Sequence, residues 1–262
     1  MGKDASASAH GHWQSQVRGD VPGHGHSHGN GQPGPAVRAA KERWLGSLWP
    51  FVRAQLPAAP ARVVEIGCGR LGGFVPRLER AGYQATGVDP DAPEAPGYCR
   101  AEFERYEPAE PADAIIACTS LHHVADLDEV LSMVEYALVP GAPVVVVEWA
   151  RERFDEATAR WAFGRLPPPG DEPRWLHQQQ VQWRESGRPW EPWCRSWAES
   201  ENLYDGQEVL RGLTARFGPG DVRYGPYFCP ELAGVSESDE QAAIDSGQIQ
   251  ANRIDYVGRR LG

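Results

Sequence analysis

Short apolar runs alternate with amphipathic segments through the middle of the chain. Four runs have the length of β-strands and are rich in small or branched apolar residues: 62–66, 84–88, 112–119 and 142–148. Between them, residues 73–81 and 126–138 place apolar side chains at helical spacing. Continuous apolar runs of this length are typical of parallel strands that are covered on both faces. The alternation predicts an α/β domain built on a mostly parallel sheet.

The same alternation continues toward the C-terminus. We expect helices over 207–217 and 239–249 and strands over 222–228 and 253–259. A short third strand is expected at 98–103, after a segment with several prolines. Near the other end, the apolar positions of residues 37–56 follow helical spacing, which predicts a helix that covers one edge of the sheet.

Glycines follow the first predicted strand. Gly67 and Gly69 allow the backbone to turn sharply and to approach a ligand without a Cβ in the way. Asp89 ends the second strand, where a carboxylate can accept hydrogen bonds from both hydroxyls of a ribose. These residues predict a site for a nucleotide-like ligand. A structural glycine turn beside an ordinary surface Asp fits the same pattern.

Glu65 separates two classes of cofactor. Gly67, Gly69 and Gly72 also match the G-x-G-x-x-G pattern of dinucleotide sites. A carboxylate at the end of an apolar strand is costly to bury without a partner, so Glu65 needs loop N–H groups or a cationic ligand. The spacing Glu65-x-Gly67-x-Gly69, followed by Asp89, resembles the first two motifs of the class I S-adenosylmethionine-dependent methyltransferases. This resemblance favours S-adenosylmethionine over a nicotinamide dinucleotide.

The resemblance extends downstream of these motifs. Leu121-His122-His123 follows the strand at 112–119, and Pro140-Gly141 precedes the strand at 142–148. Both turns are similar to those of small-molecule methyltransferases, so that the resemblance covers about residues 62–149. It implies a Rossmann-like, doubly wound sheet of seven mostly parallel strands with an antiparallel C-terminal strand. It also implies S-adenosyl-L-methionine as the cofactor.

The resemblance assigns candidate site residues as well. The candidates for cofactor binding are Glu65, Gly67, Cys68, Gly69, Asp89, Glu102, Phe103 and Thr119. Within this set, Glu102 would accept from the adenine amino group and Phe103 would lie beside the ring, although a solvated acid and a core Phe fit equally well.

His122, His123 and Glu148 are the candidate catalytic residues, because imidazole titrates near neutrality and this turn faces the cofactor in the family. Histidines at this turn can also be structural. Glu148 fits two roles, orienting a substrate or capping the following helix.

The composition of the chain changes after Trp149, where tryptophans become frequent. A helix is expected over 151–163, and six of the ten tryptophans lie between Trp161 and Trp197. In the resembling family a helical insertion at this place, here about residues 151–205, commonly forms a lid. Aromatic walls suit an apolar or aromatic small molecule. We expect about half of these tryptophans to pack the insertion onto the domain instead.

Composition limits the choice of partners. The formal net charge of -10 and the pI of about 5.3 argue against a nucleic-acid partner, since phosphate backbones bind basic surfaces. No apolar run approaches the length that spans a bilayer, and no signal-peptide pattern opens the chain, so we expect a cytoplasmic protein without a membrane partner. Five cysteines without a C-x-x-C pair fit reduced thiols. The sequence is compatible with a homodimer and does not decide it.

Residues 1–35 are rich in Gly, Ser, His and Pro, and we expect a disordered tail. The alternating histidines from His24 to His28 could bind a transition metal weakly, but no functional metal site is expected. A single domain over residues 36–262 is predicted to transfer a methyl group to a small, apolar or aromatic acceptor. The alternative is a protein that binds S-adenosylmethionine without transferase activity.

Overall fold

The computed structural model describes residues 34–170 and 174–261. The predicted tail and its histidines therefore lie outside the described residues, apart from Gly34 and Pro35, of which Pro35 opens the first helix. Within the described part of the chain, no helix is long and apolar enough to cross a membrane.

A seven-stranded sheet forms the centre of the molecule, in the order β3-β2-β1-β4-β5-β7-β6. The strands are β1 (Arg62–Ile66), β2 (Gln84–Val88), β3 (Tyr98–Cys99), β4 (Ala114–Cys118), β5 (Pro143–Trp149), β6 (Asp221–Gly225) and β7 (Arg253–Arg259). Strand β7 pairs antiparallel with both β5 and β6, and the pairs formed by β1 to β5 are parallel. This arrangement confirms the predicted Rossmann-like sheet with its antiparallel C-terminal strand.

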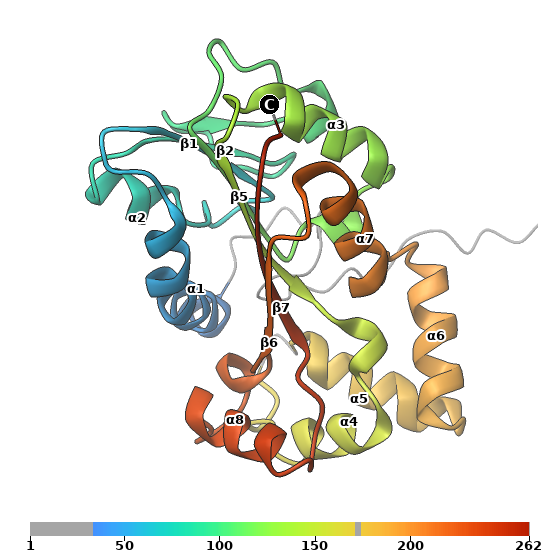
Figure 1. Cartoon of the computed structure of the whole chain (residues 1–262). Coiled ribbons are helices and arrows are strands. Elements are labelled where there is room, and N and C mark those ends of the chain that lie inside the picture. Colours follow the sequence, from blue (N-terminus) through green and yellow to red (C-terminus); the bar gives the residue numbers. More distant parts are fainter. Residues whose placement is uncertain (1–33, 171–173, 262) are drawn as a thin grey trace, which may run out of the picture.

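Helices cover both faces of this sheet (Figure 1). The helices are α1 (Pro35–Gln55), α2 (Val75–Arg80), α3 (Leu127–Ala137), α4 (Glu156–Phe163), α5 (Trp175–Ser186), α6 (Trp190–Ser200), α7 (Gly206–Phe217) and α8 (Glu237–Asp245). Single 3-10 turns are η1 (Phe103–Arg105), η2 (Leu121–His123), η3 (Arg151–Arg153) and η4 (Cys229–Glu231). Helices α1 and α2 lie on one face, and α3 and α7 on the other.

Alternation along the strands produces two cores. Val63 and Val145 belong to the cluster beneath α1 and α2, whereas their neighbours Val64 and Val146 belong to the cluster beneath α3 and α7. Successive side chains of a strand point to opposite faces, which is the reason for this division. All residues of β4 and β5 are buried, as expected of central strands with helices on both sides.

Some predicted boundaries are wrong. The third strand is only two residues long, because the chain turns into η1 at Phe103. Helix α2 begins at Val75 and not at Gly73, whose φ of 54° is incompatible with a right-handed helix. The helix expected over 151–163 is divided into η3 and α4, since Asp155 caps α4 by accepting from Thr158 N at 2.8 Å. Strand β6 ends at Gly225, before the expected Phe228.

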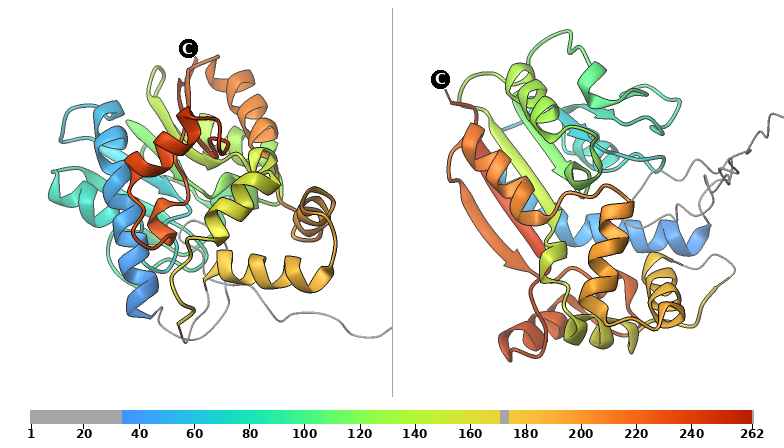
Figure 2. Two further views of the ribbon diagram at one scale, coloured as in Figure 1. Left: turned by 90° about the horizontal axis from the view of Figure 1, so that it is seen from below. Right: turned by 90° about the vertical axis from the view of Figure 1, so that its right-hand side faces the viewer.

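Residues 151–205, called the insertion below, place α4, α5 and α6 beyond the end of β5 (Figures 1 and 2). Of its six tryptophans, Trp161, Trp175, Trp190 and Trp193 are buried in the same core as α1. Trp183 and Trp197 pack against this core and stay partly exposed. Packing therefore accounts for more than the expected half of these side chains.

Candidate functional site

The carboxyl ends of four parallel strands meet at one edge of the sheet. Ile66 at the end of β1 is in register with Val88 of β2 and with Ala117 of β4, and Cys118 of β4 is in register with Val147 of β5. The residues at or just after these ends include most of the predicted site: Gly67, Cys68, Gly69, Asp89, Thr119, His122, His123 and Glu148. Open α/β sheets bind ligands at this edge.

The glycine loop is fitted tightly against the turn after β4. Gly67 has a φ of 76°, and its N–H donates to Val88 O at 2.9 Å. A Cβ on Gly67 would collide with Cβ of Ser120, whose hydroxyl donates to Ile66 O at 3.0 Å. A side chain at this position is therefore excluded by both conformation and space.

Glu65 is buried beneath this loop. Its Oε2 accepts a hydrogen bond from Phe74 N at 2.7 Å, and a Cβ on Gly73 would overlap the carboxylate. Burial raises the pKa of Glu65 to about 8, although the charge of Lys41 opposes the shift. Loop N–H groups are thus one partner of Glu65, as the sequence suggested. The elevated pKa shows that they do not fully compensate for lost hydration.

Asp89 joins the loops after β1 and β2. The side chain is 3% exposed, with Oδ2 accepting from Gly69 N at 2.9 Å and Oδ1 accepting from Asp91 N at 2.8 Å. Asp89 is therefore a structural clamp between the two loops.

The remaining cofactor candidates differ in how they could act. The Cys68 thiol is buried against Gly87, and burial raises its pKa far above the usual range, so only the main chain of Cys68 is suited to a ligand. Thr119 has a φ of 53°, a strained value for a β-branched residue, and its hydroxyl donates to Cys118 O at 2.7 Å.

Glu102 and Phe103, at the start of η1, differ in burial. Glu102 is exposed, while the Phe103 ring is buried 5.7 Å from the ring of Tyr106. The packing of Phe103 fits the alternative of a core side chain. The cofactor roles of both residues stay predictions.

Glu148 and His122 form a buried pair at the end of β5. Both residues are 1% exposed, and Glu148 Oε2 lies 2.5 Å from His122 Nδ1. Glu148 also accepts from three backbone groups: Ser120 N at 3.0 Å, Leu121 N at 2.8 Å and Trp149 N at 3.0 Å. The carboxylate thus holds the η2 turn, instead of capping the helix that follows β5. Because a carboxylate accepts, Nδ1 of His122 carries the proton and Nε2 is the basic nitrogen of the neutral ring.

His123 lies beside this pair. Its ring centroid is 4.2 Å from that of His122, and the side chain is only partly buried. The structure therefore brings all three predicted catalytic residues together, and the His122 ring contacts the Glu148 carboxylate directly.

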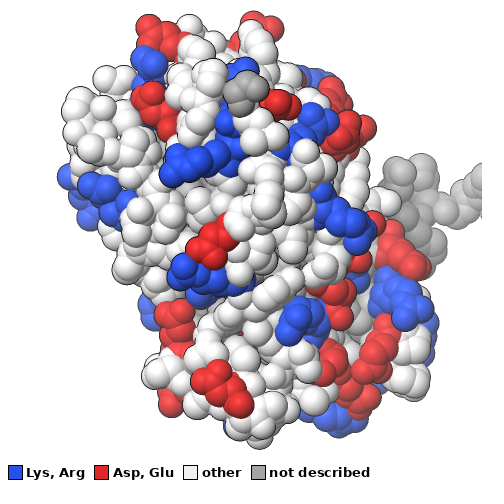
Figure 3. All heavy atoms as spheres, in the orientation of Figure 1, with Lys and Arg blue, Asp and Glu red and all other residues white. Residues whose placement is uncertain are grey.

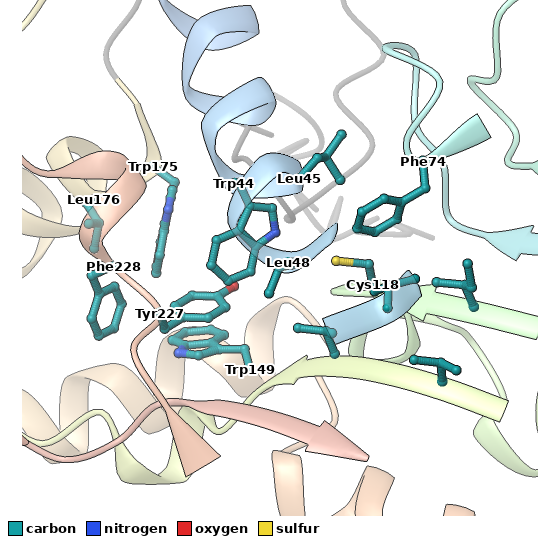
Figure 4. Close-up of a cluster of buried hydrophobic side chains, with 14 of the residues drawn as sticks. Trp44, Leu45, Leu48, Phe74, Cys118, Trp149, Trp175, Leu176, Tyr227 and Phe228 are labelled. Atoms are coloured by element: carbon teal, nitrogen blue, oxygen red, sulfur yellow. The ribbon is translucent and has the colours of Figure 1, made fainter. Parts of the chain in front are cut away.

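Four buried aromatic rings, called the aromatic wall below, were not predicted as a unit; Figure 4 shows how they lie together. The wall consists of Trp44 of α1, Trp149 of β5, Trp175 of α5 and Tyr227 from the segment after β6. Trp149 stacks on Tyr227 with centroids 6.1 Å apart and meets Trp175 edge-on at 5.3 Å. Trp44 meets Tyr227 edge-on at 5.2 Å, and Trp149 lies 6.2 Å from the ring of His122. Sequence patterns placed Tyr227 in a strand, and only the fold shows that it faces Trp149.

A family model described as a methyltransferase domain matches residues 40–207. The chain belongs to this methyltransferase family. It is an S-adenosylmethionine-dependent enzyme, as the glycine loop, Asp89 and the downstream turns indicated. A search of curated protein sequences found no match for the methyltransferase.

Solved structures share its fold at low sequence identity. A protein from Pyrococcus horikoshii OT3 is 12% identical with a TM-score of 0.51, and the match covers 84% of this chain and 91% of that one. Geranyl diphosphate C-methyltransferase from Streptomyces coelicolor A3(2), solved with Mg²⁺, geranyl diphosphate and S-adenosyl-L-homocysteine, is 16% identical with a TM-score of 0.50. That match covers 84% of this methyltransferase and 80% of the Streptomyces enzyme. Among the described residues, no cluster of His, Cys, Asp or Glu could hold a metal ion.

Proposed function

We propose that this methyltransferase acts on a small, apolar or aromatic acceptor. The observation that carries the proposal is the aromatic wall, in which Trp44, Trp149, Trp175 and Tyr227 converge beside the His122–Glu148 pair. Large, rigid rings offer apolar contact area at little cost in conformational entropy, and they suit a flat or apolar molecule. The insertion contributes Trp175 to the wall. We propose that residues 151–205 serve as a lid within a single domain.

The residues at the sheet edge fit S-adenosylmethionine. We propose that the Gly67–Gly69 backbone and Asp89 hold the nucleoside part, with the Asp89 carboxylate accepting from ribose hydroxyls at the end of β2. Glu65 fits the cationic part, because a nearby positive charge would offset the burial that raises its pKa to about 8.

Methyl transfer then depends more on the alignment of acceptor and cofactor than on a strong acid or base. When bound, the cofactor supplies an electrophilic methyl group on a positively charged sulfur. The protein has to orient the acceptor and exclude water, tasks that suit the aromatic wall. We propose that His122 accepts a proton from the acceptor at Nε2, while Glu148 fixes the ring through Nδ1 and stabilises the protonated ring.

The net charge of -10 supports a small acceptor over a nucleic acid. On the face shown in Figure 3, acidic and basic side chains are interspersed without a continuous basic surface. We expect the protein in the cytoplasm.

Labelled cofactor tests this proposal. The full chain is incubated with methyl-labelled S-adenosylmethionine and, separately, with the small-molecule and macromolecular fractions of a cell extract. Label should appear in products of the small-molecule fraction only. The Asp89→Ala variant, which loses the clamp on Gly69, serves as the control and should yield no product.

Two results would argue against the proposal. Label found only in protein or nucleic acid would contradict the small acceptor. Tight binding of S-adenosylhomocysteine without any labelled product would instead favour a protein that binds the cofactor without transferring methyl groups.

A further inference from the structure

Two buried carboxylates lie close together in the chain between β6 and β7, and they differ in their partners. Glu240 of α8 accepts hydrogen bonds from Tyr227 N at 2.7 Å, Phe228 N at 3.0 Å and Cys229 N at 2.6 Å. Glu231 of η4 is 4% exposed, yet neither of its carboxylate oxygens has a hydrogen-bond partner among the described residues. Buried carboxylates are normally hydrogen-bonded, so Glu231 requires an explanation.

Two arginines only partly compensate for the burial of Glu231. Arg174 Nη1 lies 3.4 Å from Oε2, which is too long for a strong charged hydrogen bond. Arg43 directs Nη2 to Pro230 O at 3.0 Å and contributes its charge to Glu231 from there. Burial still raises the pKa of Glu231 to about 7 against both charges. Oε1 in particular is left without any donor among the described residues.

The position of Glu231 connects it to the aromatic wall. Arg43 and Arg174 immediately precede Trp44 and Trp175 of the wall, so the same backbone segments carry both sets of side chains. Tyr227 links the two ends: its ring meets Trp44 edge-on at 5.2 Å and stacks on Trp149, the residue after Glu148, and Glu231 follows Tyr227 four positions later in the chain. An acceptor lying against Tyr227 would therefore be near both carboxylates.

We propose that Glu231 is a specificity residue that accepts a hydrogen bond from an N–H or O–H group of the acceptor. This inference rests on the proposed function and narrows its substrate class to aromatic or apolar molecules that carry such a donor. The donor gives Glu231 Oε1 the hydrogen bond that it lacks, as backbone N–H groups do for the carboxylate of Glu240. An acceptor without a donor leaves Oε1 without a hydrogen bond and is disfavoured.

Four probes of matched shape test the inference: 2-phenylethylamine, 2-phenylethanol, propylbenzene and 3-phenylpropionate. Their affinities are measured with the full chain saturated with S-adenosylhomocysteine, by calorimetry or by the change in tryptophan fluorescence. The amine and the alcohol should bind about 10-fold or more tightly than propylbenzene, because a hydrogen bond to a buried charged group is worth that much. The carboxylate probe should bind most weakly.

The variants Glu231→Leu and Glu231→Gln separate recognition from folding. In Glu231→Leu the preference for the amine and the alcohol over propylbenzene should disappear, with propylbenzene changing less than about two-fold. Glu231→Gln keeps one acceptor oxygen and should retain a preference for the alcohol while losing that for the amine. Glu240→Gln is the matched control: it should lower the melting temperature and leave the ratio of affinities unchanged.

Three results would overturn the inference. Tightest binding of 3-phenylpropionate would show that Arg43 and Arg174 recognise an acidic acceptor. An unchanged preference in Glu231→Leu would show that another group recognises the donor, and binding of none of the probes would remove the inference as well. Labelled methyl transfer to the small-molecule fraction decides the proposed function separately, whichever of these results is found.

Discussion

The edge of the sheet and the η4 turn of this methyltransferase hold buried carboxylates with different partners. In residues 62–149, Asp89 and Glu148 accept backbone hydrogen bonds that hold their loops in place without a ligand. In η4, Glu231 is equally buried but has no hydrogen bond among the described residues, whereas Glu240 of α8 accepts three. The sheet edge is thus preorganised by its own backbone. Under the proposal above, Glu231 keeps one acceptor oxygen for a donor of the substrate.

The largest expected effect tests the preorganised sheet edge. Gly67→Val should weaken binding of S-adenosylhomocysteine by about 100-fold or more, because a side chain at a φ of 76° is strained and collides with Ser120. Calorimetry measures the affinity. Gly170→Ala is the control, since a Cβ there meets nothing within 4 Å. Near-normal affinity of the valine variant would show that the loop adapts to its ligand.

The second effect concerns turnover. His122→Ala should lower kcat by about 100-fold, the usual contribution of a positioned base, with the affinity for S-adenosylhomocysteine changed less than two-fold. Single-turnover kinetics with an identified acceptor measure it. His123→Ala should have a much smaller effect, because it leaves the 2.5 Å contact between His122 Nδ1 and Glu148 in place. Equal losses in the two variants would contradict the role assigned to His122.

A third effect tests Glu65 by the pH dependence of stability. A carboxyl whose pKa is raised from 4.5 to about 8 on folding holds its proton more tightly in the folded state. Its contribution to stability is therefore complete below pH 4.5 and is lost as the pH rises through about 8. Glu65→Gln cannot ionise, and its melting temperature should fall less between pH 6 and pH 9 than that of the native chain. Parallel melting curves would show that Glu65 is ionised throughout.

The smallest effect belongs to the surface of the insertion. Arg160 pairs with Glu156 one helical turn away on α4, and its side chain is 67% exposed. Arg160→Ala should change the free energy of unfolding by less than about 1 kcal/mol, because water and salt screen exposed pairs. Chemical denaturation measures the difference. A larger loss would mean that the stacking of Arg160 on Trp183 matters more than its charge.

Much of the sheet was predictable because its signal is local. Strands β1, β2 and β7 have the predicted bounds, since each is a short apolar or alternating run between clear breaks. The bounds of the third strand were predicted wrongly because this local signal is weak there. Residues 98–103 carry little apolar patterning, and turns occupy much of the backbone between Pro96 and Phe103. The edge position of this strand leaves few contacts to extend it.

The site was predictable only where residues close in sequence act together. The spacing from Glu65 to Gly69 identifies a cofactor loop, because these residues belong to one turn. The bond between Glu148 and His122 joins residues 26 positions apart, and it depends on the register of β4 with β5. Tyr227 meets Trp44 and Trp149 from the segment after β6, where the sequence pattern predicted a continued strand. Long-range packing decides such positions.

Glu148 holds the η2 turn against the end of β5 by hydrogen bonds, which matters for the redesign of this enzyme. The hydrogen-bond donors to Glu148 all lie at or before Trp149, ahead of the insertion. The insertion touches the turn again at Tyr204, whose N–H donates to His122 O at 3.1 Å. A foreign insertion that joins after Trp149 and ends before Tyr204 would inherit an intact His122–Glu148 pair. The sheet edge would then stay unchanged while the insertion, with Trp175 of the aromatic wall, is exchanged.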